Sequence, residues 1–167
     1  MTIKKPKLWQ RLVAMGLVGV FVVIDQLVKL WAVSNLRGQG RMVVIPGFLG
    51  LRYAENTGIS FGLLGDLPVV MNVVTAVTGL LMAAALVWLL LGRLPGMQMW
   101  AAALVLGGGL GNFIDRAVQG FVVDYLEFLF MRFAIFNLAD VFITCGMVWL
   151  CVAIFMAESR KSKAMEP

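Results

Sequence analysis

The 167-residue sequence has no histidine and only two cysteines. Without histidine, a Ser-His-Asp or Cys-His mechanism is excluded, and so is a zinc site of the usual His/Cys kind. The cysteines, Cys145 and Cys151, lie six residues apart on one expected helix. At 100° per residue they point in different directions and cannot bridge each other. We expect two small, buried, apolar side chains there.

Charged residues are also few. They make up 14% of the sequence, whereas 61% of the residues are hydrophobic. A soluble globular domain has roughly a quarter charged residues and about half apolar ones. This composition excludes an ordinary water-soluble domain, and it is far too apolar for a disordered chain.

The spacing of the charges predicts four membrane-spanning helices in a single integral membrane domain. No charged residue occurs at 67–92, 94–114 or 141–157, and about 20 apolar helical residues cross a bilayer. The first span has a basic start like that of a signal peptide, but Asp25 and Lys29 interrupt its apolar run, so we expect a retained helix. The expected spans are 12–33, 68–92, 97–116 and 138–157.

The net charge of +5 does not predict nucleic-acid binding, because the basic residues follow the membrane topology. Four of them precede the first span, Arg93 lies in the short second loop, and three more follow the last span. Such an excess marks the cytoplasmic side of a membrane protein. We therefore expect both termini in the cytoplasm and the other two loops at the outer face.

The two outer loops differ in character. Residues 35–66 contain many glycines between β-prone pieces, which predicts short strands. Residues 117–137 are rich in phenylalanine, and we expect an outer loop or short helix that lies in the membrane interface. The fold class expected is therefore all-α in the membrane, with a small outer β element from the first loop.

A glycine run occurs at 107–111 within the third span. It does not match the spacing of a dinucleotide-binding loop, and no strand is expected before it. Gly107 and Gly111 form a small-xxx-small pair, which predicts close helix packing in lipid.

Several polar and charged residues lie near the outer ends of the expected spans. Because charge in a membrane is energetically costly, we expect each of them to have a structural or functional role. Asp25 and Lys29 are spaced i, i+4 and can form an ion pair; either a structural pair or a role in a site fits that spacing. Asn112, Asp115 and Arg116 gather at the end of the third span. Asp115 and Arg116 are adjacent, so each needs its own partner, and a structural brace is an alternative to a site.

Asp124 and Asp140 are the two most informative carboxylates. Both lie at the expected outer end of the membrane, and neither has a basic residue close in sequence. Two carboxyl groups brought together share a proton. One can then activate water while the other donates to a carbonyl oxygen, which is peptide hydrolysis without histidine or metal. A proton-conducting pair and a structural hydrogen-bonded pair remain alternatives.

Five polar segments occur in order along essentially the whole chain. They are DQLVK at 25–29, NTGISF at 56–61, GNFIDR at 111–116, VVDY at 122–125 and FNLAD at 136–140, which continues to Ile143 and Gly146. These segments resemble the motifs of the lipoprotein signal peptidases, the type II signal peptidases of bacterial membranes. The chain differs slightly at Ile59, Ser60 and Gly109, where alanine is usual in the family; these are packing positions.

The resemblance implies an aspartic endopeptidase in the bacterial cytoplasmic membrane, with an outer β-cradle on four spans. It would remove the signal peptide just before a diacylglyceryl-modified cysteine, with no metal or cofactor, and globomycin would inhibit it. The resemblance makes Asp124 and Asp140 the catalytic pair. We expect a monomer in contact with membrane lipid. The motif positions that would bind substrate or support the pocket are Asn56, Gly58, Asn112, Asp115, Arg116, Asn137, Asp25 and Lys29.

Two other classes of function are weaker. A proton-coupled transporter would use the two aspartates as a relay, but a relay needs acidic residues at several depths, and here they gather at one end. A non-catalytic membrane scaffold would use the glycine and aromatic residues as its interface, but it would not need five polar motifs.

Overall fold

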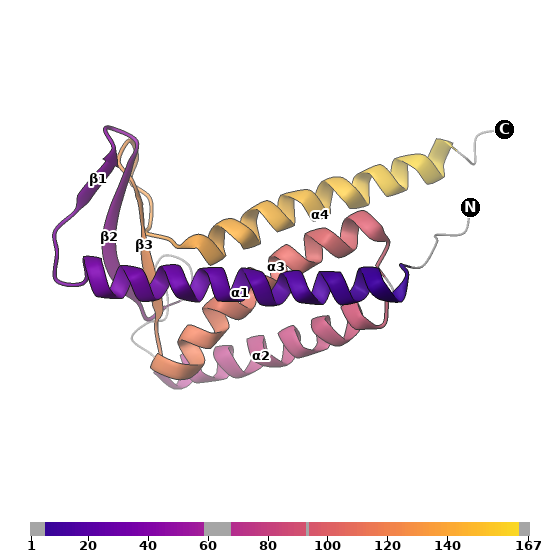
Figure 1. Cartoon of the computed structure of the whole chain (residues 1–167), viewed down its shortest axis with the longest axis horizontal. Coiled ribbons are helices and arrows are strands. Elements are labelled where there is room, and N and C mark those ends of the chain that lie inside the picture. The colour runs from indigo at the N-terminus through magenta and orange to yellow at the C-terminus, as the bar shows by residue number, and fades with distance from the viewer. Residues whose placement is uncertain (1–5, 59–67, 93, 164–167) are drawn as a thin grey trace.

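The computed structural model describes residues 6–58, 68–92 and 94–163. Four long helices lie alongside one another, and a small sheet crosses one end of the bundle, here called the sheet end (Figure 1). This confirms the predicted fold class. The helices are α1 (Leu8–Leu36), α2 (Pro68–Leu90), α3 (Gly96–Gln119) and α4 (Leu138–Lys163). The strands are β1 (Met42–Ile45), β2 (Leu49–Asn56) and β3 (Val122–Phe128).

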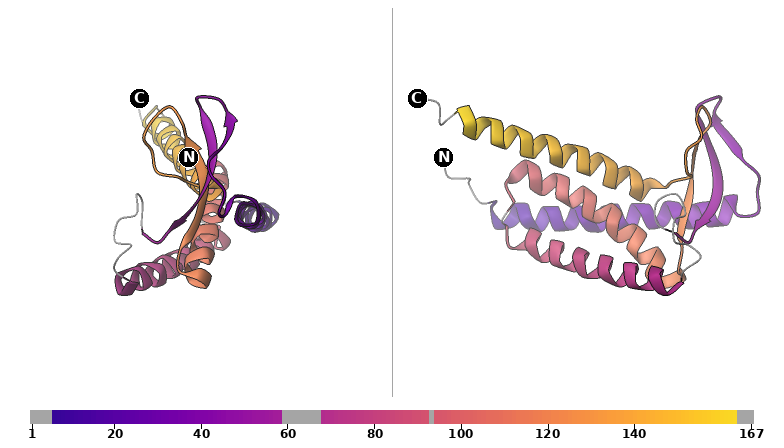
Figure 2. Two further views of the ribbon diagram at one scale, coloured as in Figure 1. Left: turned by 90° about the vertical axis from the view of Figure 1, so that its left-hand side faces the viewer. Right: turned by 180° about the vertical axis from the view of Figure 1, so that it is seen from behind.

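All four helices are long and apolar enough to cross a bilayer. The mean hydropathy is lowest for α3, at 1.3, and the other three helices reach 2.0 or more. α3 is also the most buried helix, because it contacts each of the other three. Since polar side chains in a membrane protein face the protein interior, the central helix is where the polar residues of the bundle belong. The views in Figure 2 show the bundle from its sheet end and from behind.

Glycines allow α3 to lie at the centre. Gly107, Gly108 and Gly109 face three different helices, because a Cβ at these positions would meet α1, α4 and α2 in turn. Gly111 faces α1 again, where a Cβ would overlap the carboxylate of Asp25. The predicted packing role of Gly107 and Gly111 is confirmed, since both press against α1.

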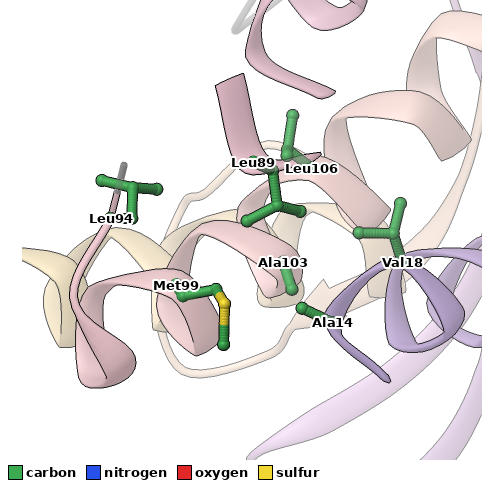
Figure 3. Close-up of a cluster of buried hydrophobic side chains, with 7 residues drawn as sticks. All are labelled: Ala14, Val18, Leu89, Leu94, Met99, Ala103 and Leu106. Carbon is green, nitrogen blue, oxygen red and sulfur yellow. The ribbon is translucent and has the colours of Figure 1, made fainter. Parts of the chain in front are cut away.

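An apolar cluster joins α1, α2 and α3 and contains no charged side chain (Figure 3). This cluster holds the helices together without using the polar residues gathered near the sheet. Its buried members are Ala14, Val18, Leu89, Leu94, Met99, Ala103 and Leu106.

The sheet is antiparallel, in the order β1-β2-β3. Its third strand corrects the expectation for 117–137, which we predicted to be a loop or short helix. Residues 122–128 pair with β2 over its whole length, from Leu49 opposite Phe128 to Asn56 opposite Val122. β3 is an edge strand of the sheet, an isolated bridge joins its Leu126 to Phe136 on the other side, and most of its residues are buried. Because its polar side chains, Asp124 and Glu127, are buried along with the apolar ones, the segment shows no clear alternation.

A second cluster anchors the sheet to α1. Val123 and Tyr125 of β3 are buried against Ala32 and Leu36 in the last turns of α1. The sheet therefore has a fixed position relative to the first helix. Residues 59–67, which include part of the expected first-loop segment, lie outside the described residues.

The two cysteines are free and exposed on α4, so the prediction that they are buried was wrong. The reason is that a membrane-spanning helix is surrounded by lipid and not by water. Lipid is as apolar as a protein core, and a small apolar side chain is equally stable on a lipid-facing helix surface.

Candidate active site

A cavity of about 550 Å³ opens at the sheet end between β3, α3 and α4. Asp124 and Asp140 both line it, together with Asn56, Asn112 and Arg116. Apolar side chains from 133–136 and from the first turns of α4 form much of the remaining wall. The structure thus brings the two predicted carboxylates into one cavity, with polar donors on one side and apolar surface on the other.

Asp140 is positioned by the start of α4. Asn137 is the N-cap residue, and its side-chain oxygen accepts a hydrogen bond from the backbone N–H of Asp140 at 3.0 Å. The Asp140 side chain accepts one in return from the backbone N–H of Asn137, also at 3.0 Å. This reciprocal arrangement is a capping box, and it fixes the Asp140 carboxylate at the mouth of the helix.

Asp124 is buried on β3 and accepts two side-chain hydrogen bonds. Asn137 donates to its Oδ1 at 2.7 Å and Asn56 donates to its Oδ2 at 3.0 Å. Burial raises the pKa of Asp124 to about 6, and the nearby charge of Asp140 contributes in the same direction. The donated hydrogen bonds oppose the increase, because they favour the charged carboxylate.

Asn112 connects the carboxylate pair to the inside of the bundle. Its side-chain nitrogen donates to Asp140 Oδ1 at 2.8 Å, and its oxygen accepts from Lys29 Nζ at 2.9 Å. The same oxygen accepts from the side chain of Asn137 at 3.1 Å. Because the oxygen faces two donors, the amide can present only its nitrogen to Asp140.

Lys29 sits among buried acceptors. Its ammonium group lies 2.9 Å from Asp25 and 2.9 Å from Asp115, and the three charged side chains are almost fully buried. The predicted Asp25–Lys29 pair is confirmed. With Asn112 as the third acceptor, all three N–H donors of the ammonium group are used.

The two carboxylates paired with Lys29 also hold backbone. Asp25 accepts from the backbone N–H of Ala139, in the first turn of α4, at 3.0 Å. Asp115 accepts from the backbone N–H of Val123 on β3 at 3.1 Å. The ion-pair cluster therefore braces the segments that carry Asp140 and Asp124, which is the structural alternative left open by the sequence.

Arg116 extends from α3 toward the end of β2. Its guanidinium group donates to the carbonyl of Gly58 at 3.2 Å, and the N–H of Gly58 donates to the side chain of Asn56 at 3.1 Å. Arg116 and Asp115 have separate partners, as their adjacent positions predicted. The Arg116 Nε atom is buried and has no hydrogen-bond partner among the described residues.

Two residues of this network were not predicted as site residues. Gln26 donates to Asp115 Oδ1 at 2.9 Å and to the carbonyl of Gly111 at 3.2 Å. The Tyr125 hydroxyl accepts from the backbone N–H of Leu138, at the start of α4, at 3.2 Å. Gln26 lies inside the DQLVK segment and could have been selected on that basis. Nothing in the sequence indicated the Tyr125 contact, because it depends on how β3 meets α4.

Comparison with known proteins agrees with this geometry. The model of the signal peptidase (SPase) II family matches residues 17–156 of the chain. The chain belongs to the signal peptidase II family. Among its relatives, the lipoprotein signal peptidase of Rickettsia bellii (strain OSU 85-389) is 36% identical over 149 residues, covering 87% of this chain and 76% of the relative. That of Clostridioides difficile (strain 630) is 36% identical over 140 residues, covering 82% and 90%.

Solved structures support the same assignment. A bacterial membrane enzyme determined by the in meso method at 2.3 Å resolution superposes with a TM-score of 0.74 at 25% identity and covers 96% of both chains. A second, at 1.9 Å resolution, gives a TM-score of 0.72 at 25% identity, covering 92% of this chain and 97% of the other. Membership of the signal peptidase II family supports a lipoprotein signal peptidase function. Together with the four candidate spans, it supports a multi-pass membrane protein.

Proposed function

We propose that the chain is an aspartic endopeptidase that removes the signal peptide of prolipoproteins before a diacylglyceryl-modified cysteine. The observation that carries the proposal is the pair Asp124 and Asp140, which line one cavity and share Asn137 as a hydrogen-bonding partner. The family supplies the class of substrate.

In this proposal one carboxyl group holds a proton and the other activates water. Asp124 is suited to hold the proton, because burial raises its pKa to about 6. Asp140 then acts as the base toward a water molecule in the cavity. Attack of that water on the scissile carbonyl produces a tetrahedral intermediate, and the proton on Asp124 passes to its oxygen. Collapse of the intermediate breaks the C–N bond, Asp140 gives the water-derived proton to the leaving amine, and a hydroxyl group of the intermediate returns a proton to Asp124 as the new carboxyl group forms.

Arg116 provides a further donor. Its Nη2 donates to the Gly58 carbonyl, and the side chain lines the cavity. A substrate carbonyl or a developing oxyanion in the cavity would accept from the guanidinium group. We assign Asn56, Asn112 and Asn137 to orient the two carboxylates, and Asp25, Lys29 and Asp115 to brace the network behind them.

The cavity wall fits a lipid-modified substrate. Val141, Ile143 and Thr144 line it from α4, and Phe133 and Phe136 line it from the preceding segment. A signal helix and a diacylglyceryl group are apolar, so both can reach the cavity laterally through the bilayer. The polar side of the cavity then receives the peptide bond.

We place the cavity at the outer face of the cytoplasmic membrane. The first turn of α1 and the last turn of α4 lie together at the end of the bundle opposite the sheet (Figure 1). The basic residues before the first span and after the last one would make that end cytoplasmic. The sheet end, with both aspartates, would then face outward.

The proposal is tested with the purified full chain in detergent and a synthetic prolipoprotein peptide. One peptide carries a diacylglyceryl group on the cysteine, and a matched peptide has a free thiol. We expect mass spectrometry to show cleavage directly before the lipidated cysteine only, and globomycin to block it. Equal cleavage of both peptides would contradict the substrate assignment. Absence of cleavage by folded protein would contradict the peptidase itself and favour the proton relay.

A further inference from the structure

Two arginines pair with one glutamate on the sheet, and a third arginine lines the same cavity. Arg41 forms a bidentate pair with Glu127, with Nε–Oε2 at 2.6 Å and Nη2–Oε1 at 2.8 Å. Arg52 also reaches Glu127, with Nη2–Oε1 at 3.2 Å. The hydrogen bond from Arg41 holds the pKa of Glu127 below its usual value. Glu127 is therefore ionised, and it orients two guanidinium groups.

The cluster has an excess of positive charge. Arg41 and Arg52 keep about half of their side-chain surface exposed, although Glu127 is 8% exposed. Arg132 is exposed beside them, and none of the described carboxylates pairs with it. Three cations and one anion leave two positive charges at a site that still presents free N–H donors.

These residues line a cavity of about 880 Å³ that neither aspartate lines, although it adjoins their cavity and shares Phe128, Phe133 and Ala134 with it. Its wall includes Arg41, Arg52, Glu127, Arg132, Phe130 and Phe133. Gly50 lies opposite Glu127 in the sheet, and a Cβ there would lie 3.1 Å from the Leu129 side chain, which is one of the residues lining the cavity.

The rim of the cavity is aromatic and exposed. Phe130 stacks on Phe48 with ring centroids 5.3 Å apart and an angle of 5° between the rings, yet 57% of Phe130 is exposed. Met131 and Phe133 beside it are also exposed. Exposed aromatic side chains next to cations are typical of the membrane–water interface. Figures 1 and 2 show the strands crossing one end of the helices. With the four candidate spans placed across a bilayer, that end would lie at the depth of the lipid headgroups.

We infer that this cavity binds the headgroup phosphate of an anionic phospholipid in the leaflet at the sheet end. Guanidinium groups recognise phosphate by paired N–H donors, and the surplus charge matches a phosphodiester that has no cation of its own. The aromatic rim contacts the glycerol and the first methylenes of the lipid. The site would hold the sheet against the bilayer, and it does not depend on peptidase activity.

The test uses the full chain in dodecylmaltoside and native mass spectrometry. The probes are palmitoyl-oleoyl phosphatidylglycerol and, at equal concentration, the corresponding phosphatidylcholine. The main variant is Arg132→Gln, which removes one cation without breaking an ion pair between described residues. Arg132→Lys retains the charge. The matched control is Arg37→Gln, since Arg37 is an exposed arginine of the same region that pairs with Glu55 outside this cavity.

We expect the wild-type protein to retain phosphatidylglycerol in preference to phosphatidylcholine. Arg132→Gln should weaken phosphatidylglycerol binding about fivefold, which corresponds to one basic residue at a membrane surface. Arg132→Lys and Arg37→Gln should bind nearly as wild type. Should Arg132→Gln fail to fold, as judged by thermal unfolding and size-exclusion chromatography, Arg52→Gln replaces it.

Three results would overturn the inference. Equal retention of the two lipids would show that the site does not distinguish lipids by the charge of their headgroups. The same loss in Arg37→Gln as in Arg132→Gln would show a general effect of surface charge. Displacement of the lipid by millimolar inorganic phosphate would show a site for a free anion and not for a phospholipid. None of these measurements involves cleavage, so they leave the proposed function untouched.

Discussion

Asn137 and Asp140 cap the same helix end for each other: the side chain of each accepts the backbone N–H of the other at 3.0 Å. The proposed catalytic carboxylate is therefore also part of the signal that starts α4. Asn137 uses its remaining donor group on Asp124 at 2.7 Å. One residue thus fixes where the helix begins and how far apart the two carboxylates lie.

Replacing Asn137 by alanine should accordingly affect both stability and turnover. The loss of an N-cap costs about 1 kcal/mol, and misplacement of the carboxylates should lower kcat about 100-fold. Thermal unfolding and cleavage of the lipidated peptide measure the two effects. The control is Asn35→Ala, since Asn35 is an exposed asparagine whose side chain donates to the backbone carbonyl of Trp31 within α1. A kcat near that of the wild type for Asn137→Ala would show that Asn137 does not position the two carboxylates.

Lys29 should be needed mainly for its charge. Its replacement by methionine leaves two buried carboxylates, Asp25 and Asp115, without their partner, and breaking such a cluster costs about 3–5 kcal/mol. The apparent melting temperature in detergent should fall markedly. A triple variant that adds Asp25→Asn and Asp115→Asn should recover part of the loss, because no unpaired charge remains. If Lys29→Met melts as the wild type does, the cluster does not hold the fold.

Gly111 lies where α3 packs closely against α1, and its substitution tests whether this close packing is required. A Cβ at this position would overlap the Asp25 carboxylate, which accepts the N–H of Ala139. We expect Gly111→Ala to lower the melting temperature and the cleavage rate together. The matched control is Gly16→Ala on α1, where a Cβ meets nothing within 4 Å. Similar behaviour of the two variants would argue against close packing at Gly111.

The raised pKa of Asp124, about 6, predicts how its contribution to stability depends on pH. The folded state binds the proton more tightly than the unfolded state, whose carboxyl titrates near 3.9. The contribution is therefore fully present below pH 4 and is lost as the pH rises to about 6. Across that window the loss is roughly 3 kcal/mol, at about 1.4 kcal/mol per pH unit.

Asp124→Asn does not titrate, so its stability relative to the wild type should increase between pH 4 and pH 6 and then stay constant. Denaturant unfolding of both proteins at pH 4.5 and pH 7.5 measures the difference. The comparison between the two pH values matters here, because the asparagine also changes one hydrogen bond at every pH. If the difference in unfolding free energy between the two proteins is the same at both pH values, Asp124 is not a buried acid with a pKa of about 6.

The sequence was sufficient for the features that depend on composition and local spacing. Uncharged runs predicted four spans, and the i, i+4 spacing predicted the pair between Asp25 and Lys29. It was not sufficient for β3, because a strand that is buried on both faces shows no alternation of polar and apolar residues. The exposed cysteines were missed for a related reason, since lipid removes the usual link between apolar character and burial.

The hydrogen-bonding roles within the site were also beyond the sequence. That Asp25 caps α4, and that Asp115 holds the backbone of Val123, depends on residues far apart in the chain. Motif positions identified such residues without showing what each one contacts. The contact between Tyr125 and Leu138 followed from no motif, because it arises only where β3 meets the start of α4.

The most direct test of the account is single-turnover cleavage of the diacylglyceryl-modified peptide by Asp124→Asn and Asp140→Asn. Glu55→Gln is the matched control, because Glu55 is an exposed carboxylate on the same strand as Asn56 but lies outside the cavity. We predict that each aspartate variant remains folded and loses at least about 1,000-fold in cleavage rate, as expected for groups that act in the chemical step. Glu55→Gln should cleave at the wild-type rate. Cleavage by either folded aspartate variant at a rate near wild type would contradict the catalytic pair.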